Sequence, residues 1–378
     1  MTRPLQSIMV TGGSGFIGTN FIRHLFSRPE FTGRIINLDK LTYAGNPLNL
    51  KEIEECHGAT VGSTPDAEGP SGGPSTDPRY IFIAADICDG SSVQRILEKY
   101  QINTIVNFAA ESHVDRSVYG PREFIDTNIN GTFALLEAAR KVWGPAAAEE
   151  GKLFHQVSTD EVFGSLGAEG RFSESSCYDP RSPYSASKAA ADHLVRAAHH
   201  TYGLPVTISN CSNNYGPYQF PEKLIPLMLL NMLDEKPLPV YGDGGNVRDW
   251  LYVEDHVEAI WLMLRQAEPG ASYNLGGDCE LDNLSLVRSL CAQMAARQGK
   301  SAEHYSRLIT FVKDRPGHDR RYAMDSSKIR AELGWRARTD FETGIARTID
   351  WYLENRPWCE AVRSGEYRNW IEVNYRRR

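Results

Sequence analysis

SIMVTGGSGFIG occupies residues 7–18, where five strand-forming residues lead into a glycine-rich turn and the start of a helix. Glycines at Gly12, Gly15 and Gly18 permit a tight turn and let the backbone approach a pyrophosphate at the helix N-terminus. Asp39 ends the next predicted strand, where its carboxylate can bond an adenosine ribose. The combination predicts a dinucleotide site for NAD rather than NADP, because a 2′-phosphate would meet the carboxylate; the lysine that follows weakens this preference. A purely structural glycine turn is the alternative.

Strand and helix patterns alternate through the first half of the chain. Beyond residues 7–11, β-branched runs predict strands at 34–38, 80–84, 104–108, 153–158 and 206–209. Helical patterns occupy residues 16–26, 91–100, 126–141 and 186–200. Such alternation predicts a parallel sheet with right-handed crossovers and helices on both faces, which is the doubly wound Rossmann-type α/β fold.

The pattern loosens after residue 210, and we expect two domains. Residues 1–210 would bind the dinucleotide, and residues 211–378 would form a smaller α/β lobe for the substrate. A return of segments near 249–277 to the first domain is left open. Helices of the lobe are expected near residues 222–233, 254–266, 284–297 and 341–352. Residues 58–79, rich in Gly, Pro, Ser and Thr, predict a flexible surface loop inserted into the first domain.

Composition excludes several classes of protein. The 41 Lys and Arg against 48 Asp and Glu give a formal net charge of −7, which argues against a nucleic-acid binder with a basic surface. The seven cysteines lack metal-ligand or CxxC spacing, so we expect no metal site and reduced thiols. The most apolar stretch, residues 224–233, is too short to span a bilayer. With no apolar signal region at its start, the chain is expected to be cytoplasmic, without membrane contact.

A tyrosine and a lysine share one face of the helix expected after Pro183. Tyr184 and Lys188 are four residues apart, which brings their side chains together on a helix. An ammonium beside a phenol lowers the pKa of the phenol, which can then take a hydroxyl proton while hydride leaves the same carbon. A solvated helix face is the alternative for this common spacing.

Two adjacent acids follow the strand predicted at 153–158. Asp160 and Glu161 come directly after Thr159, at the edge of the sheet where open α/β folds bind ligands. Two carboxylates exceed what a redox step needs, and paired acids split their pKa values so that one donates a proton while the other accepts one. Both can serve one site only if the chain leaves strand geometry, and surface charge is the alternative.

Further residues at strand ends suit a dinucleotide. Asp86 and Ile87 follow the strand at 80–84, where an adenine would lie, although Asp86 alone is equally suited to cap a helix. Small residues after the strand at 104–108, Ala109 and Ala110, leave room for the cofactor backbone.

On these motifs, the chain resembles the extended short-chain dehydrogenase/reductase family and, within it, the dTDP-glucose 4,6-dehydratases. The resemblance covers nearly the whole chain apart from residues 58–79 and the last few. The acids after Thr159 distinguish this group from related epimerases and decarboxylases. The matching segments are residues 11–18, 39–46, 109–115, 157–164, 184–188, 210–223, 248–250 and 315–321.

The resemblance implies a reaction and the residues that perform it. Tyr184, with Lys188 and Thr159, would take the proton of the sugar 4-hydroxyl as the C4 hydride passes to NAD. Glu161 would then take the C5 proton, and Asp160 would protonate the departing 6-hydroxyl. Return of the hydride to C6 would give dTDP-4-keto-6-deoxyglucose for deoxysugar synthesis and would regenerate NAD.

The resemblance also implies contacts. Those to the cofactor are Gly12, Gly15, Phe16, Ile17, Gly18, Asp39, Lys40, Leu41, Thr42, Asp86, Ile87, Ala109, Ala110, Ser112, Thr127, Tyr184, Lys188 and Asn214. Those to the nucleotide sugar are Ser112, Thr159, Asn213, Lys223, Leu224, Pro239, Val240, Tyr241, Arg248, Asn283, Arg315 and His318. The two arginines suit a diphosphate, since guanidinium groups match phosphate oxygens.

Other interpretations stay open at this point. One is a 4,6-dehydratase or an epimerase of another nucleotide sugar, although an epimerase needs no acid for a leaving hydroxyl. Another is a non-catalytic NAD-binding sensor or scaffold, since a fold does not determine a function. The resemblance further implies a homodimer that pairs through the helices at 126–141 and 186–200.

Overall fold

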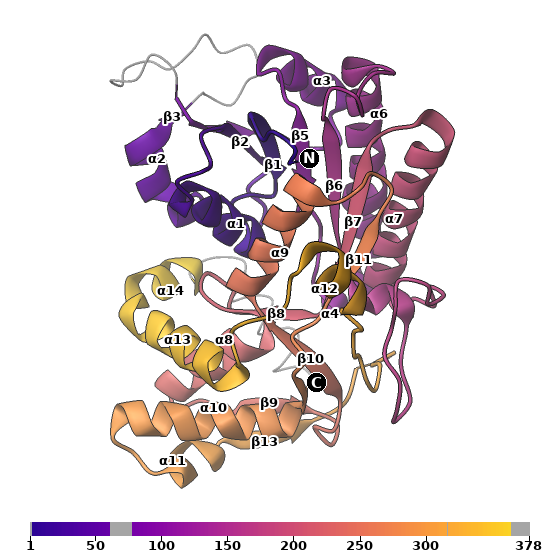
Figure 1. Ribbon diagram of the computed structural model, residues 1–378. Coiled ribbons are helices and arrows are strands. Elements are labelled where there is room, and N and C mark those ends of the chain that lie inside the picture. The colour runs from indigo at the N-terminus through magenta and orange to yellow at the C-terminus, as the bar shows by residue number, and fades with distance from the viewer. Residues whose placement is uncertain (1, 61–77, 316, 364–378) are drawn as a thin grey trace.

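An eight-stranded parallel sheet forms the centre of the molecule in the computed structural model, which describes residues 2–60, 78–315 and 317–363 (Figure 1). The order across the sheet is β11-β7-β6-β5-β1-β2-β4-β3. Chain direction across the sheet reverses at β1, which pairs with β2 on one side and β5 on the other. The strands are β1 (Ser7–Thr11), β2 (Arg34–Asp39), β3 (Gly58–Thr60), β4 (Tyr80–Ala84), β5 (Thr104–Asn107), β6 (Leu153–Thr159), β7 (Val206–Cys211) and β11 (Ser272–Leu275).

Helices cover both faces of this sheet because strand side chains alternate in direction. Met9 packs with α3, α6 and α7 on one face, whereas Ile8 and Val10 pack with α1 and α9 on the other. All three residues are fully buried. The doubly wound α/β fold expected from the sequence is therefore present. These helices are α1 (Phe16–Ser27), α3 (Gly90–Lys99), α6 (Thr132–Trp143), α7 (Pro183–Tyr202) and α9 (Val253–Gln266).

The helix expected at 126–141 is interrupted. Two short helices, α4 (Val114–Tyr119) and α5 (Pro121–Phe124), precede a π-helix, Ile125–Gly131, that continues into α6. Within the π-helix, the Asn128 amide accepts a hydrogen bond from the Glu111 N–H and donates one to the Ser187 hydroxyl. These bonds hold the π turn against the edge of the sheet where β5 ends.

The flexible loop expected at 58–79 was wrong for its first three residues. Gly58–Thr60 form β3, which pairs in parallel with β4. The outer edge of β4 offers unpaired backbone groups, and a passing extended segment can satisfy them. Residues 61–77 lie outside the described part of the chain. Two short helices lead into β3, a 3-10 helix at Pro47–Leu50 and α2 (Lys51–His57).

The residues after β7 build a second core beside the carboxyl ends of the sheet. Its three-stranded sheet has β10 (Val247–Tyr252) between β8 (Asn213–Tyr215) and β12 (Glu280–Asp282). A second pair joins β9 (Leu238–Tyr241) to β13 (Ile309–Val312). Helices that enclose this core are α8 (Leu224–Leu233), α10 (Asn283–Gln298), α11 (Ala302–Ser306), α13 (Phe341–Glu354) and α14 (Arg356–Arg363).

Part of the later chain lies with the large sheet. Strand β11 pairs with β7, and α9 packs on α1. Helix α12 (Ser327–Leu333) packs on β11 and α9. The domain division at residue 210 stays a prediction. Among the described residues, no helix is both long enough and apolar enough to cross a membrane.

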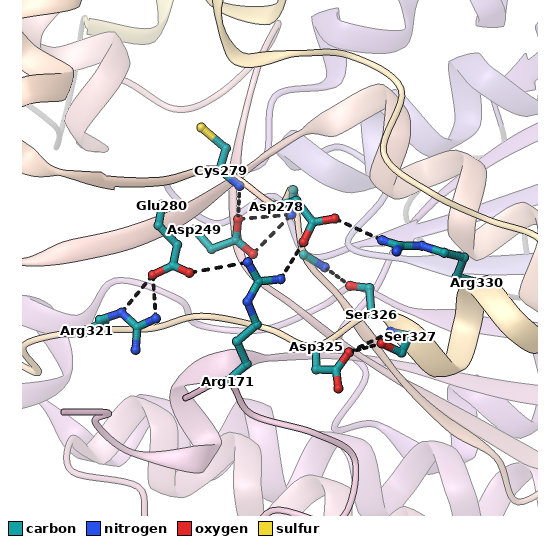
Figure 2. Close-up of polar contacts among 12 residues, drawn as sticks. Arg171, Asp249, Asp278, Cys279, Glu280, Arg321, Asp325, Ser326, Ser327 and Arg330 are labelled. Atoms are coloured by element: carbon teal, nitrogen blue, oxygen red, sulfur yellow. Dashed lines mark hydrogen bonds and ion pairs between the residues drawn. The ribbon is translucent and has the colours of Figure 1, made fainter. Parts of the chain in front are cut away.

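An ion-pair network joins β10 to its neighbours (Figure 2). Arg171 bonds Asp278 at 2.7 Å and lies 3.6 Å from Glu280, which also pairs with Arg321 at 2.7 Å. On β10, the buried Asp249 carboxylate accepts the backbone N–H groups of residues 277 and 279. Each exposed pair adds little stability alone. Together they hold the turn before β12 against β10, next to the position of Arg248.

Candidate active site

The glycine-rich turn after β1 forms a cradle for a phosphate group. Gly12 has φ +67, and a Cβ there would lie 2.8 Å from the Ala109 backbone. A Cβ at Gly18 would lie 2.5 Å from the Gly12 carbonyl oxygen. At Gly15, the N-cap of α1, the nearest heavy atom would be 3.3 Å away. Two glycines therefore pack the turn, and Gly15 leaves backbone exposed to the cavity, which fits a dinucleotide pyrophosphate.

This cradle leads to a prediction for a matched pair of variants. Gly12→Ala strains a left-handed backbone position and should lower the free energy of unfolding by about 1–3 kcal/mol. Gly15→Ala has ordinary backbone angles and should lower dinucleotide affinity with little loss of stability. Urea unfolding and a binding titration separate the two effects. Equal loss of stability in both variants would contradict the assignment.

Asp39 orders the loops around the adenosine side of the cavity. Its carboxylate accepts the Ser14 N–H at 2.9 Å and the Leu41 N–H at 2.8 Å. Burial raises the pKa of Asp39 above its ordinary value. Lys40 Nζ lies 2.6 Å from a carboxylate oxygen of Asp86, so its charge is paired there. The lysine that weakened the expected NAD preference is thus matched by an acid.

One cavity brings together all but one of the predicted cofactor residues. The exception is Leu41, which bonds Asp39 through its backbone but does not line the cavity. The cavity wall also contains residues to which sequence reasoning gave no role. They are Leu38, Ala44, Gly45, Ala85, Phe108, Glu111, Val157, Ser158, Cys211, Ser212, Gln219, Phe220 and Glu222, together with the predicted substrate residues Asn213 and Lys223.

Helix α7 supplies the tyrosine and the lysine. Ser182 caps the helix through a capping box, and Pro183 occupies its first turn. Tyr184 and Lys188 are buried and line the same cavity. The Lys188 ammonium donates a 2.7 Å hydrogen bond to the Val157 carbonyl on β6. The helix is therefore fixed to the sheet beneath the cavity.

The expected lowering of the Tyr184 pKa was wrong for the protein alone. Burial raises the pKa of Tyr184 well above its ordinary value, and the charge of Glu161 raises it further. Lys188 bonds the Val157 carbonyl, and its own pKa is lowered by burial. A hydrogen bond with Thr159 lowers the pKa of the phenol, but by less. Desolvation exceeds the local pairing that the helix spacing suggested.

The two acids lie where β6 ends. Asp160–Phe163 form a 3-10 helix, which begins at Thr159 and ends at Gly164 with φ +83. This turn is the departure from strand geometry that two adjacent acids at one site require, and Asp160 and Glu161 both line the cavity. The Thr159 hydroxyl donates to Asp160 at 3.1 Å.

Their electrostatic surroundings differ. Burial and then the charge of Glu161 raise the pKa of Asp160 well above its ordinary value. Burial also raises the pKa of Glu161, but the cations Arg315, Arg248 and Lys223 oppose that effect. One Asp160 oxygen is buried without a hydrogen-bond partner. Asp160 is thus the better proton donor of the pair and Glu161 the better acceptor.

A second cavity adjoins the first. Ser112, Glu161, Asn213, Glu222 and Lys223 line both. Of the predicted substrate residues, Thr159 lines only the first cavity. The second cavity contains Ser112, Asn213, Lys223, Leu224, Pro239, Val240, Tyr241, Arg248, Asn283, Arg315 and His318. Its wall also includes His113, Val114, Asp115, Glu161, Glu222, Leu227 and Trp250.

The arginines of the second cavity are held by backbone and acid groups. Arg248 donates to the Asp319 carbonyl at 3.0 Å and lies over the Tyr322 ring. Arg315 lies 3.8 Å from a carboxylate oxygen of the buried Asp115, whose other oxygen accepts from Tyr241. Two guanidinium groups in one cavity suit a diphosphate. Asp115 lies in a segment that the sequence analysis singled out, but nothing there indicated its partners.

Glu222 lies at the junction of the two cavities. It is buried and accepts a 2.8 Å hydrogen bond from the Tyr43 hydroxyl. Burial raises the pKa of Glu222 to about 7. Its position beside Lys223 in a singled-out segment was the available signal. Among the described residues, no three His, Cys, Asp or Glu side chains are grouped to hold a metal ion.

Comparison with known proteins identifies the family. The GDP-mannose 4,6 dehydratase family matches residues 9–348. The chain belongs to this family. It is 51% identical to a probable dTDP-glucose 4,6-dehydratase of Sinorhizobium fredii, over 95% of this chain and 96% of the relative. It is 49% identical to the dTDP-glucose 4,6-dehydratase of Salmonella typhimurium, over 98% and 99% of the two chains.

A solved dehydratase of the family has the same fold. The dTDP-glucose 4,6-dehydratase of Streptomyces venezuelae, crystallised with NAD bound, superposes with a TM-score of 0.81 at 42% sequence identity. The similarity covers 94% of this chain and all of the solved chain. Both cavities of this family member belong to the region that is shared.

Proposed function

We propose that this dehydratase-family member is a hydro-lyase that converts dTDP-glucose to dTDP-4-keto-6-deoxyglucose, a precursor for deoxysugar synthesis. NAD, when bound, accepts the hydride of C4 and returns it to C6. Gly15 would face its pyrophosphate and Asp39 its ribose. The sugar lies at the junction of the cavities, and its diphosphate meets Arg248 and Arg315.

The chain's own residues move three protons. Tyr184 takes the proton of the 4-hydroxyl, with Thr159 bonded to the phenol. The 4-keto group acidifies C5, and Glu161 takes the C5 proton. Asp160 gives its proton to the 6-hydroxyl oxygen, so the C6–O bond breaks and water leaves. Each of these side chains lines the cavity that would hold the nicotinamide.

The observation that supports this reaction best is the pair of unequal acids next to Tyr184. An epimerase inverts C4 by oxidation and reduction alone and needs no proton donor for a leaving hydroxyl. Asp160 is buried with a raised pKa, so it can be protonated near neutral pH. The preference for dTDP over another nucleotide rests on the relatives.

The deciding experiment is mass spectrometry of the product formed in heavy water. We expect dTDP-glucose to lose one water and to gain solvent deuterium at C5, and to be preferred over UDP-glucose offered in parallel. A product of unchanged mass apart from exchange would indicate an epimerase. Turnover of UDP-glucose alone would indicate a dehydratase for another nucleotide.

We also propose that the enzyme acts in the cytoplasm as a homodimer. Four exposed large apolar side chains lie on the consecutive helices α4 to α6, within the region expected to form the interface. Such clusters mark contact surfaces on proteins. They are Val118, Tyr119, Ile125 and Phe133.

A matched pair of variants tests the dimer. Phe133→Asp puts a charge into the apolar cluster and should shift the molar mass measured by light scattering from dimer towards monomer. Phe311→Asp changes an equally exposed aromatic on β13 and should leave the mass unchanged; Phe133 and Phe311 are 52% and 56% exposed. A wild-type protein that is monomeric at every concentration would exclude the proposal.

A further inference from the structure

Asp192 is a buried acid that the proposed reaction does not use. It lies on α7, one turn beyond Lys188 and two turns beyond Tyr184, so all three side chains project from one face of the helix. Its side chain has no exposed surface. It does not line either cavity, so it cannot touch a substrate or a dinucleotide there.

The hydrogen-bond partners of Asp192 are neutral. One carboxylate oxygen accepts from the Ser158 hydroxyl at 2.6 Å, from the Tyr178 hydroxyl at 2.9 Å and from the Asn210 amide at 3.5 Å. The other oxygen is buried without a hydrogen-bond partner. Neutral donors do not compensate a buried negative charge fully, so a nearby cation is required.

Two cations are available on the same helix. Lys188 is the nearer in function, because its ammonium is buried and has the Val157 carbonyl as its hydrogen-bond acceptor. Arg196 donates to the Tyr178 hydroxyl and stacks on that ring. The charge of Lys188 lowers the pKa of Asp192 more than that of Arg196 does. In return Asp192 raises the pKa of Lys188, which burial lowers.

We propose that Asp192 is a positioning residue that keeps Lys188 charged beneath Tyr184, so that the ammonium can stabilise the phenolate during proton transfer. The inference rests on the proposed function, since that reaction gives Tyr184 and Lys188 their roles. It assigns the Ser158, Tyr178 and Asn210 hydrogen bonds a purpose, namely to hold a carboxylate charge in place below the cavity.

Other groups near the pair do not replace Asp192. On β7, Cys211 also raises the pKa of Lys188, but burial raises the pKa of this thiol to about 12, so it is neutral at ordinary pH. On β6, the Val157 and Ser158 groups are uncharged. Tyr178 has its pKa raised by burial and is neutral as well. Asp192 is thus the acid that stabilises the ammonium.

The first test is the pH profile of kcat for Asp192→Asn with dTDP-glucose. The amide keeps the size of the side chain but removes its charge, so Lys188 should lose its proton at lower pH. We expect the alkaline limb of the profile to move down by about 1–3 pH units, as expected when an opposite charge is lost. Each unit is a tenfold loss of activity above that limb.

The control is Asp255→Asn, which alters a buried acid of α9 that lines neither cavity. Asp255 accepts the Thr339 N–H, so the variant should lose stability and keep the wild-type pH profile. Asp192→Glu, which keeps the charge, should restore most of the alkaline limb. An Asp192→Asn enzyme with an unshifted limb would overturn the proposal.

The second test does not depend on turnover. Urea unfolding of Asp192→Asn, of Lys188→Met and of the double variant forms a double-mutant cycle. If the two charges compensate each other, the midpoint of the double variant lies at a higher urea concentration than the sum of the single shifts. Additive shifts would overturn the proposal. Should wild-type enzyme fail to convert dTDP-glucose while the cycle shows coupling, the proposed function alone is lost.

Discussion

Replacing Tyr184 by phenylalanine should lower kcat by a factor of about 10²–10⁴, the usual contribution of a positioned acid–base group. The variant removes only the hydroxyl that takes the C4 hydroxyl proton. The ring keeps its edge contact with Phe124, whose centroid lies 6.3 Å away, so folding and cavity shape should be preserved. The loss should therefore fall on kcat rather than on the affinity for dTDP-glucose.

The measurement is single-turnover oxidation of dTDP-glucose labelled with deuterium at C4. In Tyr184→Phe, this step should become slower than all later steps. A matched control is Tyr119→Phe, which removes a hydroxyl from an exposed tyrosine outside both cavities. If Tyr184→Phe oxidised C4 at the rate of the control, another group would be the base.

Replacing Glu161 by glutamine should stop the reaction after C4 oxidation. The amide has nearly the shape of the carboxylate but cannot take the C5 proton, so dehydration should slow by about 10²–10⁴-fold. Glutamine also leaves Arg248, Arg315 and Lys223 without their nearby anion, so affinity for the diphosphate can change as well. The isotope pattern is consequently a better measure than the rate.

In heavy water, Glu161→Gln should keep C4 oxidation and incorporate no deuterium at C5. Asp160→Asn is the matched comparison, because it should still exchange C5 while losing the release of water. Together the two variants separate the proton acceptor from the proton donor. Identical isotope patterns in both would show that the acids act as one unit, contrary to their different surroundings.

Much of the central sheet was predictable because its signals are local. The strands at 7–11 and 80–84 have the expected bounds, and the glycine turn lies between β1 and α1. The π-helix at Ile125–Gly131 was not predictable, since a single wide turn leaves no distinct hydrophobic period. Strand β3 depends on the free edge of β4, which lies across a long insertion.

The site shows the same division. Tyr184, Lys188, Asp160 and Glu161 were predictable from spacing and chemistry, and the structure places all four in one cavity. The sign of the Tyr184 pKa shift was not, because it depends on burial by residues far away in the sequence. Buried acids such as Asp192 were missed for a related reason, as their partners lie on separate strands and loops.

The sequence by itself determined which local structures could form and which chemical groups were available: a phosphate-binding turn, a tyrosine and a lysine on one helix face, and two adjacent acids. These follow from backbone preferences that act over a few residues. Only the tertiary structure decided that the acids differ, that Lys188 has a buried anion behind it, and that two cavities meet at Glu161. Burial and charge are sums over neighbours from β6, β7, α7 and the second core, and folding alone brings those neighbours together.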